Sequence, residues 1–226
     1  MDEKISNISL GHLNIFHLKN KVHELSVLLN DNRATLFGVS ETRLSVKERL
    51  SFEHKVPDEI LCPANYNIYR LDSENQLHMG LAVFIHSSLF PFSKRKKEFE
   101  LDMIECLWLE IKTQQTTDPV LIGQFYRNSA YKDDWDECFM DLMFKVYSSY
   151  KHVVLLGDFN VKLNLPQPKW SSMISMLNLT QVITNSTRET EECASVIDHI
   201  YTNDTTYVSN VRVVDSSISD HKSIFL

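Results

Sequence analysis

The chain has 226 residues, 43% of them hydrophobic, and a formal net charge of −7 at pH 7. That length and apolar content suit one sizeable domain, and with no linker or internal repeat we expect residues 1–226 to form a single unit. The negative balance argues against general electrostatic adhesion to nucleic acid, which depends on Lys and Arg neutralising phosphates, but it leaves room for a local basic groove.

The cysteines and the apolar runs exclude further classes. Cys62, Cys106, Cys138 and Cys193 are far apart and show no C-x-x-C spacing, so we expect neither a zinc site nor a dense disulfide framework. Residues 1–10 lack the apolar core of a signal peptide, and no apolar run approaches membrane length. We therefore expect a reducing, intracellular location and no membrane partner.

The first half of the chain alternates strand-like and helix-like apolar patterns. Strands are predicted over residues 5–15, 34–39, 66–71 and 81–85, and a helix by the apolar spacing of residues 18–29. Residues 45–65 are charged and irregular, which is typical of a long surface segment. Residues 93–97 read Ser-Lys-Arg-Lys-Lys and are predicted to form a solvated basic loop, balanced by Glu98 and Glu100.

The second half is richer in strands than in helices. Strands are predicted over residues 106–111, 120–126, 153–157, 196–201, 208–214 and 223–226, and helices over residues 135–147 and 170–177. Alternate side chains from Cys106 to Ile111 are expected on opposite faces. Because several strands follow one another directly, the pattern favours an α/β fold in which stacked sheets carry helices on the outside.

The run from Val153 to Gly157 has no charge and no side-chain hydrogen-bonding group, which suits a strand buried on both faces. It stops at Asp158, and Asn160 follows two residues later. If the strand continues to Asn160, both side chains point to the same side; if it stops, the two residues form a turn. In layered α/β proteins, sites tend to form at the carboxyl ends of such strands.

Polar side chains recur at or near the ends of apolar runs throughout the chain. They are Asn14, Glu41, Tyr126, Asp158 with Asn160, and the pair Asp220-His221. Asp198 instead interrupts an apolar strand from within, where a charge is costly unless it is paired, hydrogen-bonded or bound to a metal. Each residue alone is compatible with a turn, a cap or a satisfied core group. The repeated placement points to a shared site.

Such a set could hydrolyse a phosphodiester with the help of a hard cation. Glu41 and the amide oxygen of Asn14 offer the oxygen ligands that Mg²⁺ prefers. Asp158 and Asn160 could hold and deprotonate the attacking water. Asp220 could bind the cation or the water.

The phosphoryl group would need partners of its own. His221 could act on a phosphoryl oxygen or as a base, and Asp198 could fix its tautomer. Tyr126 could donate to the charge that develops on phosphorus. These roles complete a hypothesis of metal-assisted phosphodiester cleavage.

Six short motifs carry a family resemblance. In chain order they are Leu13-Asn14-Ile15, Ser40-Glu41-Thr42-Arg43-Leu44, Tyr126-Arg127, Gly157-Asp158-Phe159-Asn160, Ser195-Val196-Ile197-Asp198-His199-Ile200 and Ser219-Asp220-His221. Together they resemble the endonuclease/exonuclease/phosphatase superfamily, which has the DNase I-like fold. They are most similar to the endonuclease domain of non-LTR (LINE-type) retrotransposons.

The resemblance implies a four-layer α/β sandwich, with two mixed sheets face to face and helices outside. It implies Mg²⁺-dependent cleavage of DNA, with Mn²⁺ able to substitute. In the retrotransposon branch, a nick in target DNA exposes a 3′ hydroxyl that primes reverse transcription, so we expect a nuclear location. A reverse-transcriptase domain is expected in the full-length relative, but this sequence ends just after the last motif. We expect a monomer.

Three arginines are candidate DNA contacts, and two positions depart from the family pattern. Arg43, Arg70 and Arg127 each lie beside a motif and are candidate DNA contacts. Phe16 stands where many repair members carry an acidic residue, and Gly80 is the single glycine of a turn that is often glycine-rich. Two other readings stay open: a phosphatase or abasic-site repair nuclease of the same fold, and a catalytically dead remnant that binds nucleic acid or protein.

Overall fold

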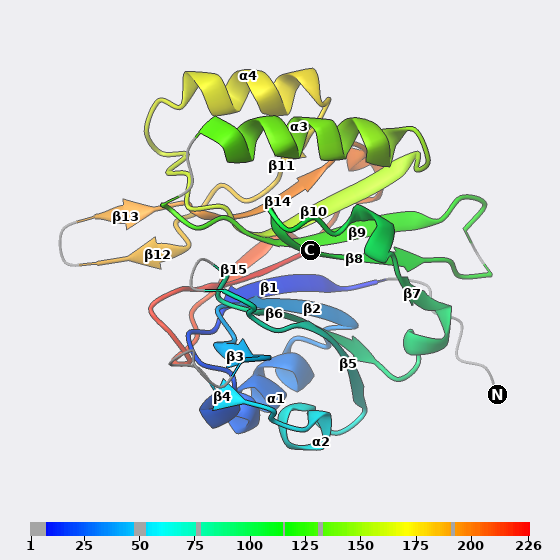
Figure 1. Cartoon of the computed structure of the whole chain (residues 1–226), viewed down its shortest axis with the longest axis vertical. Coiled ribbons are helices and arrows are strands. Elements are labelled where there is room, and N and C mark those ends of the chain that lie inside the picture. Colours follow the sequence, from blue (N-terminus) through cyan, green and yellow to red (C-terminus); the bar gives the residue numbers. More distant parts are fainter. Residues whose placement is uncertain (1–7, 48–52, 76–77, 115, 131–132, 191–192) are drawn as a thin grey trace.

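Two six-stranded β-sheets lie face to face, with helices on both outer sides (Figure 1). The computed structural model describes residues 8–47, 53–75, 78–114, 116–130, 133–190 and 193–226. Helices α3 (Asp133–Tyr147) and α4 (Pro168–Met176) cover one sheet, and α1 (Val22–Asp31) and α2 (Asp58–Leu61) lie against the other. The expected four-layer α/β sandwich is confirmed.

The first sheet gathers strands from both ends of the chain. Its order is β15 (Arg212–Val214), β16 (Ser223–Phe225), β1 (Leu10–Asn14), β2 (Leu36–Ser40), β6 (Leu81–His86) and β5 (Tyr66–Leu71). The central strands β1 and β2 are parallel, and every other neighbouring pair is antiparallel. Helix α1 makes the crossover between β1 and β2, because a parallel pair needs a long connection.

The second sheet repeats this plan. Its order is β11 (Thr180–Gln181), β14 (Asp198–Thr202), β10 (His152–Asp158), β9 (Val120–Tyr126), β8 (Glu105–Ile111) and β7 (Ser93–Arg95). Again the central pair, β9 and β10, is parallel, and α3 connects its two strands. The outer pairs are antiparallel. The central strands of the two sheets end at a common edge, where Asn14 at the end of β1 contacts Asp158 at the end of β10.

Apolar side chains fill the spaces between the four layers. The predicted alternation along β8 is confirmed, since Trp108 packs under the helices while Leu107 and Leu109 pack between the sheets. Under the helices, Trp135 and Phe139 stack with their ring centroids 5.0 Å apart. Burying each such aromatic side chain contributes on the order of 1.5–3 kcal/mol. The strands are therefore firmly packed and give rigid support to the polar side chains at their ends.

Several elements differ from the sequence prediction. The basic segment was expected to be a loop, but it contains the edge strand β7, and Lys and Arg suit an edge because they oppose further strand pairing. The segment 45–65 contains β4 (Glu53–His54) and α2, and its residues 48–52 lie outside the described part. The first predicted strand is described from residue 8 onward, and its pairing starts at Leu10.

Asp198 occupies a different place from the predicted one. It is the first residue of β14 and does not interrupt the strand from within. The strand predicted over residues 208–214 is also shorter, because η4 (Thr205–Tyr207) ends just before it and β15 begins only at Arg212. Short pieces complete the fold, namely η1 (Lys19–Lys21), β3 (Leu44–Ser45), η2 (Phe90–Phe92), η3 (Lys97–Phe99), β12 (Arg188–Glu189) and β13 (Ala194–Ser195). Among the described helices, none is long and apolar enough to cross a membrane.

Candidate active site

The polar strand ends singled out in the sequence converge on one edge of the sandwich. β1 and β2 end together, with Asn14 paired to Ser40. β9 and β10 end together, with Tyr126 paired to Asp158. β14 runs the opposite way, so its first residue, Asp198, lies beside the last residue of β10. The carboxyl ends of parallel strands and the amino end of an antiparallel strand thus meet at one place.

Asn14 links the two sheets at this edge. Its Nδ2 donates to Glu41 Oε1 and to Asp158 Oδ2, both at 2.9 Å. Glu41 Oε1 also accepts from the Tyr126 hydroxyl at 3.1 Å, and Glu41 Oε2 accepts from Arg43 at 3.2 Å. The amide hydrogens therefore lie between two carboxylates and offset part of their repulsion.

Glu41 is held in an unusual backbone conformation just after β2. Its φ is +53° and that of Arg43 is +54°, in the left-handed region that residues with a Cβ seldom adopt. The carbonyls of Gly80 and Met79 hold the turn by accepting from Thr42 N at 3.1 Å and Arg43 N at 2.8 Å. Gly80 has φ +86°, and a Cβ there would lie 2.2 Å from Thr42 Oγ1, so only glycine fits.

Glu105 supports the same turn from the second sheet. Its buried carboxylate accepts from Met79 N at 3.0 Å and from Gly80 N at 2.5 Å. Burial raises the pKa of Glu105 to about 8, although the two N–H donors act in the opposite direction. Sequence reasoning missed this residue. The only signal was a lone acid directly before the alternating strand at Cys106.

Asp198 and His221 form a buried ion pair. Asp198 Oδ2 lies 2.8 Å from His221 Nδ1, with side-chain exposures of 0% and 5%. Burial by itself would raise the pKa of Asp198, but His221 lowers it below its ordinary value. Burial would lower the pKa of His221, but Asp198 raises it to about 9. At neutral pH His221 is therefore protonated on both nitrogens, with Nδ1 bonded to Asp198 and Nε2 left as a donor.

The chain turns as soon as β10 stops at Asp158. Asn160 has φ +52°, and its backbone N donates to Asp158 Oδ1 at 2.9 Å. The strand does not continue to Asn160, so the side chains of Asp158 and Asn160 do not share a strand face. The alternative prediction, that the two residues form a turn, is correct. Asn160 still belongs to this edge, because its Nδ2 donates to Arg127 O at 3.0 Å and Arg127 N donates to Asp158 O at 2.9 Å.

Two groups at this edge have pKa values suited to proton transfer and hydrogen bonding. Burial, reinforced by the charge of Asp198, raises the pKa of Asp158 to about 7, against the lowering effect of His221. Burial and the charge of Glu41 raise the pKa of Tyr126, so its phenol keeps its proton. Near neutral pH, Asp158 can exchange a proton with a bound water while Tyr126 acts only as a donor.

The donor set fits a hard divalent cation. Glu41, Asp158 and Asp198 bring three carboxylates, whereas His221 and Arg43 bring two positive charges, so the group carries one excess negative charge once Asp158 has lost its proton. Atoms of Asp158, Asp198 and His221 that could bind a metal lie within 4.8 Å of one another. Because a protonated His221 has no free lone pair, the carboxylate oxygens would be the ligand atoms, and oxygen ligands are what Mg²⁺ prefers.

Two of the predicted metal ligands are engaged with other groups. The Asn14 amide turns its nitrogen toward the carboxylates, and its Oδ1 accepts from Phe16 N at 3.3 Å. Asp220 pairs with Arg188 at 2.6 Å and is half exposed, so its carboxylate lies apart from the group formed by Asp158, Asp198 and His221. The sequence placed Asp220 near the site, but its side-chain partner depends on the β12–β13 hairpin folding beside it.

Two of the three candidate DNA-contact arginines are committed to acidic partners. Arg70 forms ion pairs with Asp58 and Asp72 and also donates to the carbonyl of Val56. Arg127 pairs with Asp136 at 3.4 Å, and its guanidinium lies over the ring of Trp135. These contacts leave both side chains less than 20% exposed.

Arg43 is better placed for contact with a ligand. Its guanidinium lies 3.8 Å from the centroid of the Phe16 ring and pairs with Glu41 at the site edge. Phe16 itself is 47% exposed. An aromatic ring with an arginine over it is a surface on which nucleic-acid bases can stack.

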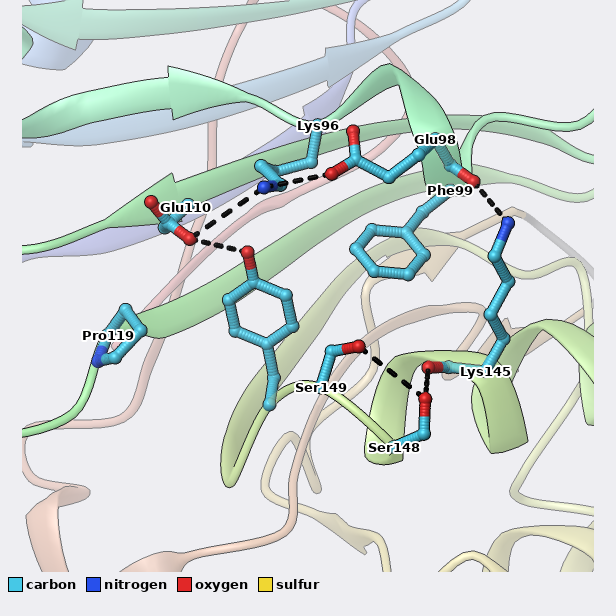
Figure 2. Close-up of a pocket in the computed structure, with 9 residues that line it drawn as sticks. Lys96, Glu98, Phe99, Glu110, Pro119, Lys145, Ser148 and Ser149 are labelled. Carbon is cyan, nitrogen blue, oxygen red and sulfur yellow. Dashed lines mark hydrogen bonds and ion pairs between the residues drawn. The ribbon is translucent and has the colours of Figure 1, made fainter.

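A separate pocket lies at the opposite end of the second sheet (Figure 2). Lys96 pairs there with Glu98 at 2.8 Å, and the Tyr150 hydroxyl donates to Glu110 at 2.5 Å. Lys145 donates to the carbonyl of Glu98 at 2.6 Å. The charged groups of this pocket are thus paired with one another, and they lie at the β8–β9 end remote from Tyr126.

Comparisons with known proteins agree with this fold. The family model described as "Endonuclease/Exonuclease/phosphatase family" matches residues 11–221. A search of curated proteins finds no match. Among solved structures, the endonuclease domain of TRAS1, a telomere-specific non-LTR retrotransposon, is similar with a TM-score of 0.73 and 12% identity, covering 97% of each chain.

Two further solved structures share the fold. The AP endonuclease LMAP from Leishmania major is similar with a TM-score of 0.75 and 11% identity, covering 96% of this chain and 86% of its own. The 3′ phosphatase NExo from Neisseria, bound to product DNA hairpin, is similar with a TM-score of 0.68 and 14% identity, covering 97% and 98%. With its matched residues spanning nearly the whole sequence and its site at the expected edge, this chain belongs to the endonuclease/exonuclease/phosphatase family.

Proposed function

We propose that the chain is a Mg²⁺-dependent DNA endonuclease of the kind that nicks target DNA for retrotransposon insertion, with Mn²⁺ able to substitute. The observation that carries the proposal is the convergence of Glu41, Asp158 and the Asp198–His221 pair on one edge with an excess negative charge. The likeness to the TRAS1 endonuclease domain supports the branch, and the DNA hairpin bound to the Neisseria phosphatase supports the substrate class. Such a role implies action in the nucleus.

The acidic groups would hold the cation and the water. Glu41 would bind the cation, which supplies Lewis acidity toward a phosphoryl oxygen when bound. Asn14 would join it after its amide turns over, and Asp220 after release from Arg188. Asp158, whose pKa lies near 7, would take the proton from the attacking water.

The remaining groups would act on the water and the phosphate. The Nδ2 of Asn160 is held by the Arg127 carbonyl, so its Oδ1 would orient the water. His221 would donate from Nε2 to a phosphoryl oxygen while Asp198 holds Nδ1. Tyr126 would donate to the charge that develops during the displacement. The Arg43–Phe16 surface would contact the flanking DNA.

A nicking assay tests the proposal. The protein is incubated with supercoiled plasmid and Mg²⁺ or Mn²⁺, with and without a chelator, beside Asp158→Ala. The matched control is Asp118→Asn, which removes a half-exposed carboxylate at the far end of the second sheet. We expect nicking by the wild type and the control with either metal, and none with chelator or with Asp158→Ala.

Parallel substrates distinguish the alternatives. An oligonucleotide with one abasic site and another with a 3′ phosphate are presented under the same conditions. Intact plasmid with cleavage of only the abasic substrate would indicate a repair nuclease, and release of phosphate alone would indicate a phosphatase. No turnover on any of the three, with DNA binding retained, would indicate a binding remnant.

A further inference from the structure

Three polar side chains are buried between the sheets, behind the catalytic edge. His12 in β1 and Gln124 in β9 are 0% and 1% exposed, within a layer otherwise formed by aliphatic side chains such as Leu10 and Ile122. Asp198 at the start of β14 is also fully buried. Polar groups in such a layer are costly unless each is hydrogen-bonded, so their partners decide what they do.

The contacts form a chain that ends at the catalytic histidine. Gln124 Nε2 lies 3.0 Å from His12 Nδ1, so the amide donates and Nδ1 accepts. The ring proton is then on Nε2, which lies 3.4 Å from Asp198 Oδ1. Within the described part of the chain, neither of these two buried atoms has another partner. The two atoms face each other at a distance longer than an ordinary hydrogen bond, and Asp198 Oδ2 is left for His221.

A glycine in the facing sheet makes room for this arrangement. A Cβ on Gly38 in β2 would lie 1.9 Å from Gln124 Oε1 and 2.5 Å from its Cδ. Any larger residue would therefore push the amide away from His12. Three positions, in β1, β2 and β9, thus maintain one chain of polar contacts.

We propose that His12, oriented by Gln124, is a positioning residue of the nuclease. Its Nε2 faces one oxygen of Asp198 at 3.4 Å, so the carboxylate lies between two imidazoles and presents its second oxygen to His221 Nδ1. His221 Nε2 is thereby aimed at the substrate. This inference rests on the proposed function, and it assigns His12 no contact with DNA or metal.

The sequence contained one sign of this role. His12 and Asn14 are two residues apart in a strand, so they share a face, but an isolated histidine in an apolar strand is usually a satisfied core residue. Only the packing of β1 against β14 brings it to Asp198.

The first experiment reads the hydrogen bonds directly. Metal-free protein labelled with ¹⁵N-histidine is examined by NMR at pH 7.5, and signals are assigned with His12→Gln and His221→Gln. We expect His12 to carry one proton, on Nε2, and His221 to carry two. In His12→Leu, the Nδ1 proton of His221 should exchange with water at least tenfold faster, because Asp198 is no longer fixed.

The second experiment reads the consequence for catalysis. His12→Leu should lower kcat for nicking by about 10–100-fold with KM for DNA within threefold, as for other residues that orient a catalytic group. His12→Gln keeps a donor at the same reach and should stay within about fivefold of the wild type. Gly38→Ala, which displaces Gln124, should fall between the two.

Tyr201→Phe is the matched control. Tyr201 lies on the opposite face of β14, where its hydroxyl accepts from Trp170 Nε1 at 2.8 Å and lies 3.0 Å from His199 Nδ1. Loss of the Tyr201 hydroxyl removes buried hydrogen bonds of a similar kind but leaves the contacts of Asp198 unchanged. The kcat for nicking should therefore stay within threefold of the wild type. This variant separates loss of stability from loss of positioning.

Two protonated nitrogens on His12, a kcat for His12→Leu within threefold of the wild type, or His12→Gln as slow as His12→Leu would each overturn the proposal. If the wild type nicks no DNA but the NMR result is as expected, the positioning of His221 stands and the proposed function fails. Unchanged exchange at His221 in His12→Leu sinks the positioning role whatever the nicking assay shows.

Discussion

The buried carboxylate of Glu105 should make the protein less stable as the pH rises toward 8. Its side chain is 1% exposed and accepts two backbone N–H donors from the turn at Met79 and Gly80. Two donors favour the charged form, but burial outweighs them and raises the pKa from an ordinary value of 4.5 to about 8. We predict that this single group dominates the difference in pH dependence between the wild type and Glu105→Gln.

The sign and size follow from linkage. Between pH 4.5 and 8 the folded protein binds the Glu105 proton more tightly than the unfolded chain, so the free energy of unfolding falls as pH rises. The contribution is fully present below 4.5 and is lost as the pH rises through 8. The whole difference corresponds to about 5 kcal/mol, of which about 2.5 kcal/mol falls between pH 5 and 7.

Urea denaturation at pH 5 and pH 7, followed by tryptophan fluorescence in metal-free buffer with chelator, checks this. Glutamine offers one acceptor to two N–H donors, so Glu105→Gln should be about 1–3 kcal/mol less stable than the wild type at pH 5. At pH 7 the gap should close by about 2.5 kcal/mol. Glu59→Gln, an exposed replacement in α2, serves as control and should track the wild type.

The comparison isolates Glu105, because all other titrating groups are common to the two proteins. Parallel pH dependence of the wild type and Glu105→Gln would refute the reasoning. So would a gap that widens toward pH 7, since that would mean the two backbone donors outweigh burial.

Three further predictions concern the site and its support. Asp158→Asn should abolish nicking yet raise the free energy of unfolding of the metal-free protein at pH 8, which urea denaturation measures. Burial and Asp198 raise the pKa of Asp158 to about 7, so at pH 8 the wild type holds an unfavourable buried charge that the amide lacks. Tyr201→Phe should cost about 1–3 kcal/mol in urea denaturation, because Trp170 Nε1 loses its buried acceptor. Mg²⁺ at about 100 times its dissociation constant should stabilise the wild type by about 2.7 kcal/mol in thermal unfolding, and Glu41→Ala should lose this gain.

Each of these has a contrary result. Asp158→Asn that unfolds more easily at pH 8 would show that its hydrogen bonds outweigh its burial. An unchanged free energy of unfolding in Tyr201→Phe would mean that water accepts the hydrogen bond from Trp170 Nε1. Equal stabilisation of the wild type and Glu41→Ala by Mg²⁺ would place the cation elsewhere.

The sequence alone determined the fold class and selected most of the candidate site residues, because both depend on patterns that are local. Periods of two and near 3.6 residues place strands and helices, and a polar group that ends an apolar run must lie at a sheet edge. Glu41, Asp158 and Asp198 could therefore be selected without coordinates. The errors fall where local pattern is silent: charge predicted a loop at residues 93–97, but pairing with β8 made Ser93–Arg95 an edge strand.

The tertiary structure decided which of these groups touch. Asn14 lies between Glu41 and Asp158, which are 117 residues apart (158 − 41), only because two sheets pack face to face. Asp220 pairs with Arg188 because the β12–β13 hairpin folds beside it, and no local sequence pattern predicts the position of that hairpin. Glu105 and His12 were overlooked because their roles arise from burial against other strands. Burial and partner choice are properties of the packed chain, and they set the pKa values and hydrogen bonds on which the chemistry depends.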